Sequence, residues 1–373
     1  MSSAIAASCN SMIKWIVLLS TAIMIVVNTK SKGKNCEKLN RVIFFAILFS
    51  FIVAFTSFIN SSYPVTSVFK MISFLLPFLA VMHCVAVIDT MKIVNYFVAV
   101  YLILFLLSFI IIPFNQFRIV NDDFQGVFNH VNMLGTISTI FISTILYSNL
   151  IKIRSIKIVI IGLVLFMVYL SASRTGMLSS VSVVLVYVLF GNFTVQQKSL
   201  IVCLALMIFV VVPLLLEEGV LNNIRQGIFD FLWKNSEESV LDSRKGLMED
   251  AYERFLSSKF FGTGFMVPYD AGFRSYALSF DLVVEPGNIV FMLLGDTGIV
   301  GTTLFLVLFL VILFNGKLDR IYLIFGAFMV NFGEMVFFSS NNMSVLIYIL
   351  ISLYMFVDSG ESNNEIEHSR TCL

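Results

Sequence analysis

Apolar runs recur along almost the whole chain, and they constrain its fold more than any other feature. A helix needs about 20 apolar residues to cross the hydrocarbon core of a bilayer, where every backbone polar group must be satisfied. Eleven runs approach this length, at roughly 12–28, 42–59, 66–88, 93–112, 131–150, 156–171, 175–190, 199–216, 297–314, 321–338 and 343–357. We therefore predict an all-α polytopic integral membrane protein, with residues 1–373 forming one membrane domain of about 11 (10–12) transmembrane helices.

Composition excludes several classes of function. Hydrophobic residues make up 58% of the chain and charged residues 13%, whereas a soluble domain is about half apolar and a quarter charged. The net charge of +1 leaves no basic surface for phosphates, so we expect no nucleic-acid partner. The five cysteines stand singly, without metal-ligand spacing, and no nucleotide-binding glycine loop is present. We predict no metal and no cofactor. The 39 phenylalanines are expected to face lipid.

The basic residues of the short connections predict the orientation of the helices. If eleven helices alternate, one side receives Lys30, Lys32, Lys34, Lys38, Arg41, Lys92, Lys152, Arg154, Lys157, Lys198, Lys317 and Arg320. The short connections on the opposite side carry only Arg118 and Arg174. We therefore predict a cytoplasmic tail at residues 358–373 and call the opposite side the outer side. The first run has no cleavage site after it, so we expect it to remain as a helix.

One connection on the outer side is much longer than the others. Residues 217–286 form a predicted loop between the eighth and ninth helices, with 12 acidic and 7 basic residues. Within it, apolar residues recur at helical spacing between Leu247 and Leu256, which predicts an amphipathic helix of about 15 residues. After this loop, residues 288–314 are too long for one span, so we expect a break near Gly295–Gly298. Residues 288–295 would then form a short interfacial helix.

Few polar residues on the outer side are candidates for chemistry. Arg174 lies in a connection too short to leave the membrane surface, where it either anchors the topology or binds phosphate through its bidentate fork. Arg244 begins the predicted loop helix and is either a solvated charge or a second phosphate ligand. Glu285 lies before the chain returns to the interface and is either a loop carboxylate or a general base. The candidate substrate-binding residues are Arg118, His130, Asn132, Asn288, Asp296 and Glu334. His130 and Asn132 also fit a helix cap, and Glu334 a contact between helices.

Three motifs resemble those of the O-antigen polymerase and ligase superfamily, most closely the Wzy-type polymerases. The first is the turn Ser171–Gly176, Ser-Ala-Ser-Arg-Thr-Gly. The second joins Ser243–Leu247, Ser-Arg-Lys-Gly-Leu, to Phe260–Gly264, Phe-Phe-Gly-Thr-Gly. The third runs from Asn288 to Gly301, where many members have His-Asn and later Glu-x-Gly-x-x-Gly. The segment Phe128–Gly135 is also similar to an earlier turn in members, so the resemblance covers residues 128–301.

This resemblance implies a GT-C-like glycosyltransferase membrane fold and an O-antigen polymerase in the bacterial inner membrane, with its active site facing the periplasm. The implied substrates are undecaprenyl-pyrophosphate-linked oligosaccharides, joined without a metal into lipopolysaccharide O-antigen. Arg174 and Arg244 would hold the pyrophosphate, and Glu285 would act as the base. Membrane lipid, a chain-length regulator protein and a flippase are the implied partners.

One departure from the family pattern separates the possible activities. Gly287 stands where ligases and many polymerases have a histidine to which ligase chemistry is attributed. This departure favours a polymerase over an O-antigen ligase that transfers glycan to lipid A-core. A polysaccharide flippase or transporter remains an alternative, but it should show paired halves or coupling carboxylates at mid-membrane. A non-catalytic assembly factor would place no demand on Arg174 or Arg244.

Overall fold

The computed structural model describes residues 34–87, 90–112, 124–128, 131–191, 245–267, 288–338 and 343–356. Every regular element within these ranges is a helix. The long helices are α2 (Lys34–Asn60), α3 (Pro64–Val87), α4 (Thr90–Ile111), α5 (Val131–Tyr147), α6 (Arg154–Leu170), α7 (Arg174–Phe190), α10 (Lys245–Ser257), α12 (Ile289–Asn315), α13 (Ile321–Gly333) and α14 (Met343–Phe356), with a short 3₁₀ turn, η4 (Leu318–Arg320). The predicted all-α class is confirmed for these residues.

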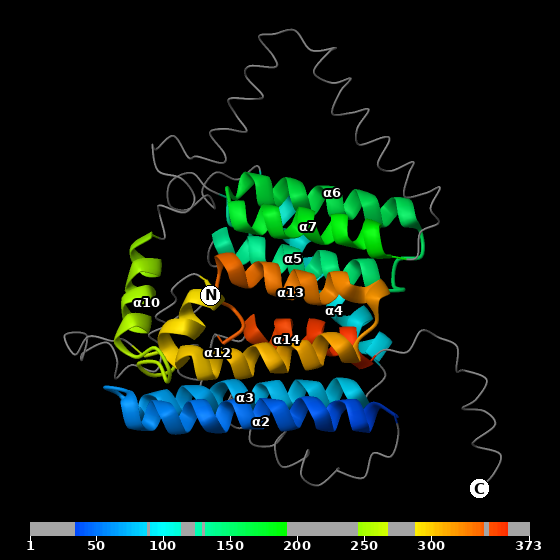
Figure 1. The fold of residues 1–373 in the computed structure, drawn as a ribbon. Helices are drawn as coiled ribbons and strands as arrows, with labels where there is room; N and C mark the ends of the chain where they lie inside the picture. Colours follow the sequence, from blue (N-terminus) through cyan, green and yellow to red (C-terminus); the bar gives the residue numbers. More distant parts are fainter. Residues whose placement is uncertain are drawn as a thin grey trace, which may run out of the picture.

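The helices form a bundle, with α10 lying across one end of it (Figure 1). Neighbouring pairs include α2 with α3, α5 with α7, α7 with α13, and α12 with both α2 and α10. At the α10 end, Gly264 lies against Ser61, and Asn288 at the start of α12 bonds to Phe332 near the end of α13. At the opposite end, the Tyr354 hydroxyl donates to the carbonyl of Leu313. Helix ends that are distant in the sequence therefore lie at the same end of the bundle.

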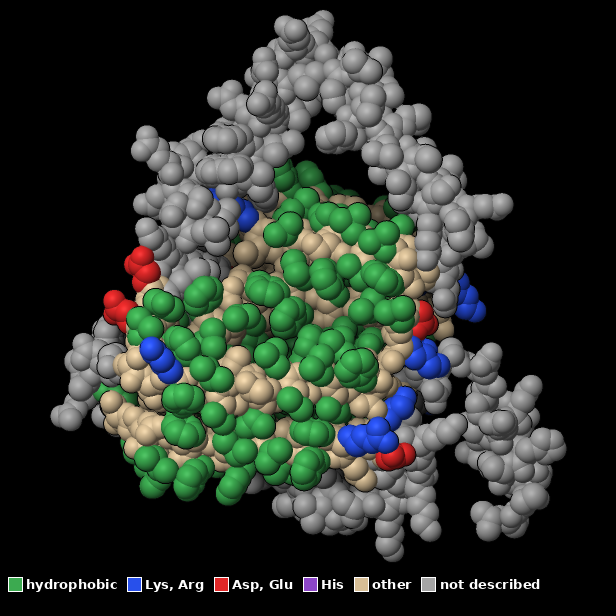
Figure 2. Space-filling model, viewed as in Figure 1, with side chains coloured by type: hydrophobic (Ala, Val, Ile, Leu, Met, Phe, Trp, Pro, Cys, Tyr) green, Lys and Arg blue, Asp and Glu red, His purple; other side chains and the backbone are tan. Residues whose placement is uncertain are grey.

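Several helices have the length and composition needed to cross a membrane. Within the part of the chain that the structure describes, four qualify on both grounds: Glu37–Asn60, Pro64–Ala86, Met91–Ile111 and Ile289–Asn315. Val131–Tyr147, Arg174–Phe190 and Ser344–Phe356 are shorter apolar helices. Figure 2 shows apolar side chains across the middle of the bundle, with charged side chains toward its two ends. The predicted runs at 12–28 and 199–216 lie outside the described residues, so the count of about 11 helices stays a prediction, as does the 217–286 loop outside residues 245–267.

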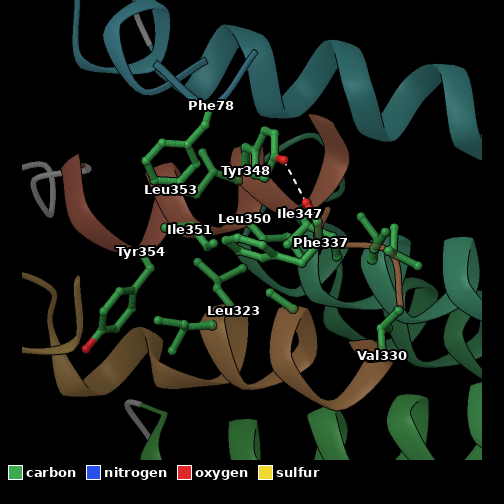
Figure 3. Packing of buried hydrophobic residues seen from close by; sticks show 14 of the residues in the cluster. Phe78, Leu323, Val330, Phe337, Ile347, Tyr348, Leu350, Ile351, Leu353 and Tyr354 are labelled. Atoms are coloured by element: carbon green, nitrogen blue, oxygen red, sulfur yellow. Dashed lines mark hydrogen bonds between the residues drawn. The ribbon is translucent and has the colours of Figure 1, made fainter. Parts of the chain in front are cut away.

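Part of the phenylalanine content forms an interior cluster, so the expectation that these side chains face lipid is wrong for that part. Phe49, Phe74 and Phe78 are buried, and the rings of Phe74 and Phe338 meet edge to face with centroids 4.9 Å apart. Figure 3 shows part of the same core around α14, where the Tyr348 hydroxyl donates to the carbonyl of Phe337 over 2.6 Å. Lipid is as apolar as these side chains, so close packing and hydrogen bonds, rather than burial from water, hold such helices together.

Small residues bring α5 and α7 into close contact. A Cβ atom added to Gly135 would lie 2.9 Å from the Cα of Gly176, and the hydroxyls of Thr139 and Ser180 are 2.9 Å apart one turn further along. Glycines and hydroxyl residues at such positions let helix backbones approach closely within a bilayer. This contact sets the position of the first turn of α7, where Arg174 lies.

The predicted break in the helix that follows the long loop is confirmed. Backbone angles leave the helical region at Gly298, where φ is 63°. The break exposes backbone groups that the segment after α10 satisfies: Thr263 and Gly264 donate to the carbonyls of Gly295 and Asp296 over 3.2 and 3.1 Å. In return, Ile299 and Val300 donate to the carbonyls of Lys259 and Phe260 over 2.9 and 3.1 Å. Broken helices are tolerated at membrane depth only where protein supplies such partners.

Candidate functional site

Four of the predicted site residues lie at helix ends on the α10 side of the bundle. Arg174 is the first residue of α7, Asn288 is the N-cap of α12, Asn132 is in the first turn of α5, and Glu334 is the C-cap of α13. Direct contacts join these ends. The Asn132 amide donates to Glu334 Oε1 over 2.8 Å. The Asn288 amide donates to the carbonyl of Phe332 over 3.5 Å.

The connection that carries Arg174 is a tight turn with little freedom. Ala172 adopts a left-handed backbone with φ of 50°, the Ser171 hydroxyl donates to the carbonyl of Val168 over 2.7 Å, and Ser173 is buried. Ser173 makes no side-chain cap to α7. The positive end of a helix dipole disfavours a cation and favours an anion. The dipole of α7 therefore does not stabilise the charge of an arginine at this position. The guanidinium and the start of the helix would both favour an anionic ligand.

The same tight packing places α13 against this turn. A Cβ atom added to Gly333 would lie 2.3 Å from the side chain of Thr175, the residue after Arg174. Glu334 follows Gly333, so a carboxylate, an amide and a guanidinium are held at one end of three packed helices. These are the groups needed to orient a hydroxyl and to bind an anion in the same place.

Asn331 shapes the chain around Glu334, and sequence reasoning missed it. This side chain is buried, and its Oδ1 accepts from the backbone nitrogens of Val336 and Phe337 over 2.9 and 2.6 Å. Its amide donates to the carbonyl of Ala327 over 2.6 Å. Asn331 thereby satisfies the backbone where α13 ends and fixes the turn that presents Glu334. An asparagine near the end of an apolar run, before a glycine, was the only sequence signal.

A second polar group is buried between α10 and α12; it contains Asp296, a predicted site residue, and Arg254, which was missed from the sequence. Arg254 Nη1 donates to Asp296 Oδ1 over 2.6 Å, with both side chains 2% exposed. Asp296 Oδ2 accepts from the backbone nitrogen of Met266 over 2.8 Å, and Lys70 Nζ donates to the carbonyl of Met266 over 2.6 Å. This network ties the loop helix and the segment after it to α3 and to the break in α12.

The predicted substrate-binding role of Asp296 has no support in this arrangement. Its side chain is buried, and both of its oxygens are engaged by Arg254 and Met266. The groups around Asp296 belong to the protein, so this carboxylate does not contact lipid. Arg118, His130, Arg244 and Glu285 lie outside the described residues, so their roles stay predictions.

The comparison with protein families matches the middle of the chain. The model of the O-antigen ligase family matches residues 159–306. Over these residues the chain is similar to members of the O-antigen polymerase and ligase superfamily. The resemblance predicted from the three motifs is therefore confirmed. No curated protein matches the chain.

The superfamily segment contains most of the geometry described above. It runs from within α6 through the Arg174 turn, α10 and the break at Gly298 into the second half of α12. Arg174, Arg254, Asn288 and Asp296 lie inside it. Asn132 and Glu334 lie outside the matched residues, and only the packing of α5 and α13 against α7 brings them to the same end. Members of this superfamily are membrane glycosyltransferases, either polymerases or ligases.

Proposed function

We propose that the chain is an O-antigen polymerase that joins undecaprenyl-pyrophosphate-linked oligosaccharide repeats at the periplasmic face of the bacterial inner membrane. The observation that carries this proposal is the superfamily match over residues 159–306, which includes the turn of Arg174 and the segment with Gly287. A chain-length regulator protein and a flippase would be its partners.

The position of Arg174 supports a role in binding pyrophosphate. The residue begins α7 at the α10 end of the bundle, in a turn held by Ser171 and by the close contact of α7 with α5. A guanidinium binds two phosphate oxygens at once, and a helix start adds N–H groups that favour the same anion. In the proposed reaction Arg244, which immediately precedes α10 in the sequence, would supply a second guanidinium.

The proposed transfer balances without a metal or a nucleotide. The hydroxyl oxygen of the incoming unit bonds to the anomeric carbon of the growing glycan, and the bond from that carbon to the pyrophosphate oxygen breaks. The pyrophosphate leaves with the electron pair, and the hydroxyl proton passes to a base. Cations placed in advance where this negative charge develops lower the barrier. The energy comes from the glycosyl pyrophosphate bond.

Two carboxylates are candidates for the base. Glu285 precedes Gly287, the position at which relatives carry a histidine, and is our first choice. Glu334 is the second, because it lies at the same end of the bundle as Arg174, with the Asn132 amide 2.8 Å from its Oε1. That amide orients the carboxylate, and a fixed orientation suits a base.

The polymerase assignment is tested by deleting the gene and separating the surface polysaccharides on a gel. A polymerase mutant is expected to lose the ladder of lengths while keeping a band that carries a single repeat. Loss of both the ladder and the single-repeat band, with full-length polymer left on the lipid carrier, would indicate the O-antigen ligase instead. Loss of both with no polymer on the carrier would indicate the flippase.

A further inference from the structure

The loop helix α10 has three different faces. Ala251 and Arg254 are buried against α12, while Glu249, Asp250 and Glu253 form an exposed acidic face. The third face consists of Tyr252 and Leu256 and continues into Phe260 and Phe261 directly after the helix; all four side chains are exposed. We call these four residues the apolar α10 face. Large apolar side chains gathered on one side of an otherwise charged helix usually contact something apolar.

The direction of α10 suits a location at the membrane surface. Figure 1 shows α10 running across the ends of helices that lie roughly parallel to one another, and α10 contacts α12 directly. Since α12, α2 and α3 are candidate membrane spans, a helix that crosses their ends lies close to the plane of the bilayer. Amphipathic helices in this orientation bury their apolar face about 5–10 Å into the boundary between headgroups and acyl chains.

The apolar α10 face is continuous with the exposed apolar surface of α12. The carbonyls of Lys259 and Phe260 accept from the backbone nitrogens of Ile299 and Val300, so Phe260 lies beside the part of α12 that follows the break at Gly298. Exposed apolar side chains then follow along α12 at Ile299, Leu306, Leu310 and Phe314. The surface that meets lipid along this span therefore extends onto the segment after α10.

Two helices measure the depth of this segment independently. Ile299 precedes Asn315, the last residue of α12, by 16 residues, which corresponds to about 24 Å of helix. Ser57 of α2, whose hydroxyl accepts from the backbone nitrogen of Phe265, follows the exposed Arg41 by 16 residues; this again is about 24 Å. The hydrocarbon core is about 30 Å thick. Asn315 and Arg41 lie at the end of the bundle opposite α10, so both helices place residues 260–265 about 24 Å from that end. This distance is shorter than the thickness of the hydrocarbon core, so residues 260–265 lie below the headgroups and within reach of the acyl chains.

We propose that the apolar α10 face is a membrane-binding surface, inserted among the acyl chains of the bilayer lipids at the α10 end of the bundle. Its acidic face meets water, and the Arg254–Asp296 pair holds the helix against α12. The partner is the bulk bilayer lipid. This inference does not depend on the proposed polymerase reaction, since it follows from exposure, direction and depth alone.

The test uses the full chain reconstituted in lipid nanodiscs that contain no polyprenyl lipid. All five cysteines are replaced by serine, and a nitroxide is attached to Leu256→Cys, to Phe260→Cys, or to Glu253→Cys on the acidic face as the matched control. Accessibility of each label to oxygen, which concentrates in acyl chains, is compared with accessibility to a water-soluble nickel chelate. Leu256 and Phe260 are expected to favour oxygen at least several-fold more than Glu253 does.

The other results would each overturn the proposal. If the labels at Leu256 and Glu253 were equally accessible to the nickel chelate, the apolar α10 face would contact water, or it would bind a polyprenyl tail that the nanodisc lacks. Exclusion of both reagents with spin–spin broadening would mean that a second copy of the chain covers it. If the serine background does not fold, tryptophan is placed at Leu256 or Glu253 in the natural chain. Quenching by lipids brominated on their acyl chains should then be stronger at Leu256, and equal quenching would refute the proposal.

Discussion

Arg254 on the loop helix and Asp296 at the break of α12 form an ion pair with 2.6 Å between Nη1 and Oδ1, buried at 2% exposure on each side. Removing one partner of such a pair leaves an uncompensated buried charge, which costs about 3–5 kcal/mol. Arg254→Met and Asp296→Asn should each lower the thermal unfolding temperature markedly in detergent. The double variant should be less destabilised than the sum of the two, because neither Arg254 nor Asp296 is left buried without the other.

The exposed pair of Glu37 and Arg41 on α2 provides the matched control for this cycle. Exposed pairs contribute only about 0–1 kcal/mol, so Arg41→Ala should leave the unfolding temperature nearly unchanged. Additive effects of Arg254→Met and Asp296→Asn would contradict a direct energetic link between the two side chains.

Gly298 should tolerate no side chain. Its φ of 63° lies in the left-handed region, and an added Cβ would lie 2.5 Å from the Phe260 backbone. Gly298→Ala is therefore expected to reduce the yield of folded protein measured by size-exclusion chromatography. Gly162→Ala in α6 is the control, because nothing lies within 4 Å of its added Cβ; alanine there should be neutral or stabilising by about 0.5–1 kcal/mol. Equal yields of the two variants would show that the break does not need glycine.

Arg174 should not be replaceable by lysine if it grips pyrophosphate. An ammonium cannot reproduce the bidentate fork, so Arg174→Lys and Arg174→Ala should both reduce polymer formation by at least about 100-fold, the effect of losing one preorganised donor. Protein level in the membrane should stay normal. Arg154 begins α6 at the opposite end of the bundle, as Arg174 begins α7. Arg154→Lys is the control and should keep full polymer length. Full polymer length in Arg174→Lys would mean that Arg174 only anchors the topology.

The two candidate bases can be separated by replacing each carboxylate with its amide. Glu285→Gln should abolish polymerisation while lipid-linked donor still binds, and Glu285→Asp should retain part of the activity. Glu334→Gln keeps an oxygen that can accept from the Asn132 amide, so it should preserve the fold and most of the polymer. The reverse pattern, with Glu334→Gln inactive and Glu285→Gln active, would move the base to Glu334. The readout is the length distribution of the polymer from membranes supplied with lipid-linked repeats.

The orientation of the helices can be measured with reporter fusions. A reporter placed within residues 217–286 should lie in the periplasm, and one placed after Val357 should lie in the cytoplasm, because the basic short connections favour the cytoplasmic side. Reporters on the same side would rule out an odd number of spans between these sites.

Local pattern by itself determined the helical class, the positions of most described helices and the break near Gly298. Each depends on neighbouring residues: apolar runs define the helices, and the apolar stretch that begins at residue 288 is too long for one span. The Arg174 turn was also visible, because a cation between two close apolar runs stands out. The amphipathic helix was predicted from its apolar stripe, and the structure confirms a helix from Lys245 to Ser257.

Tertiary structure alone decided which polar residues meet. Arg254 and Asp296 are separated by 42 residues, and Asn132 and Glu334 by 202. Neither pair has a local signature, because helical periodicity shows which residues share a face but not which helix that face contacts. The close approach of α5 to α7 at Gly135 and Gly176 and of α13 to α7 at Gly333 brought Asn132, Arg174 and Glu334 to one end. The same physical reason explains Asp296: its sequence position suggested a substrate-binding residue, but packing against α10 buried it beside Arg254.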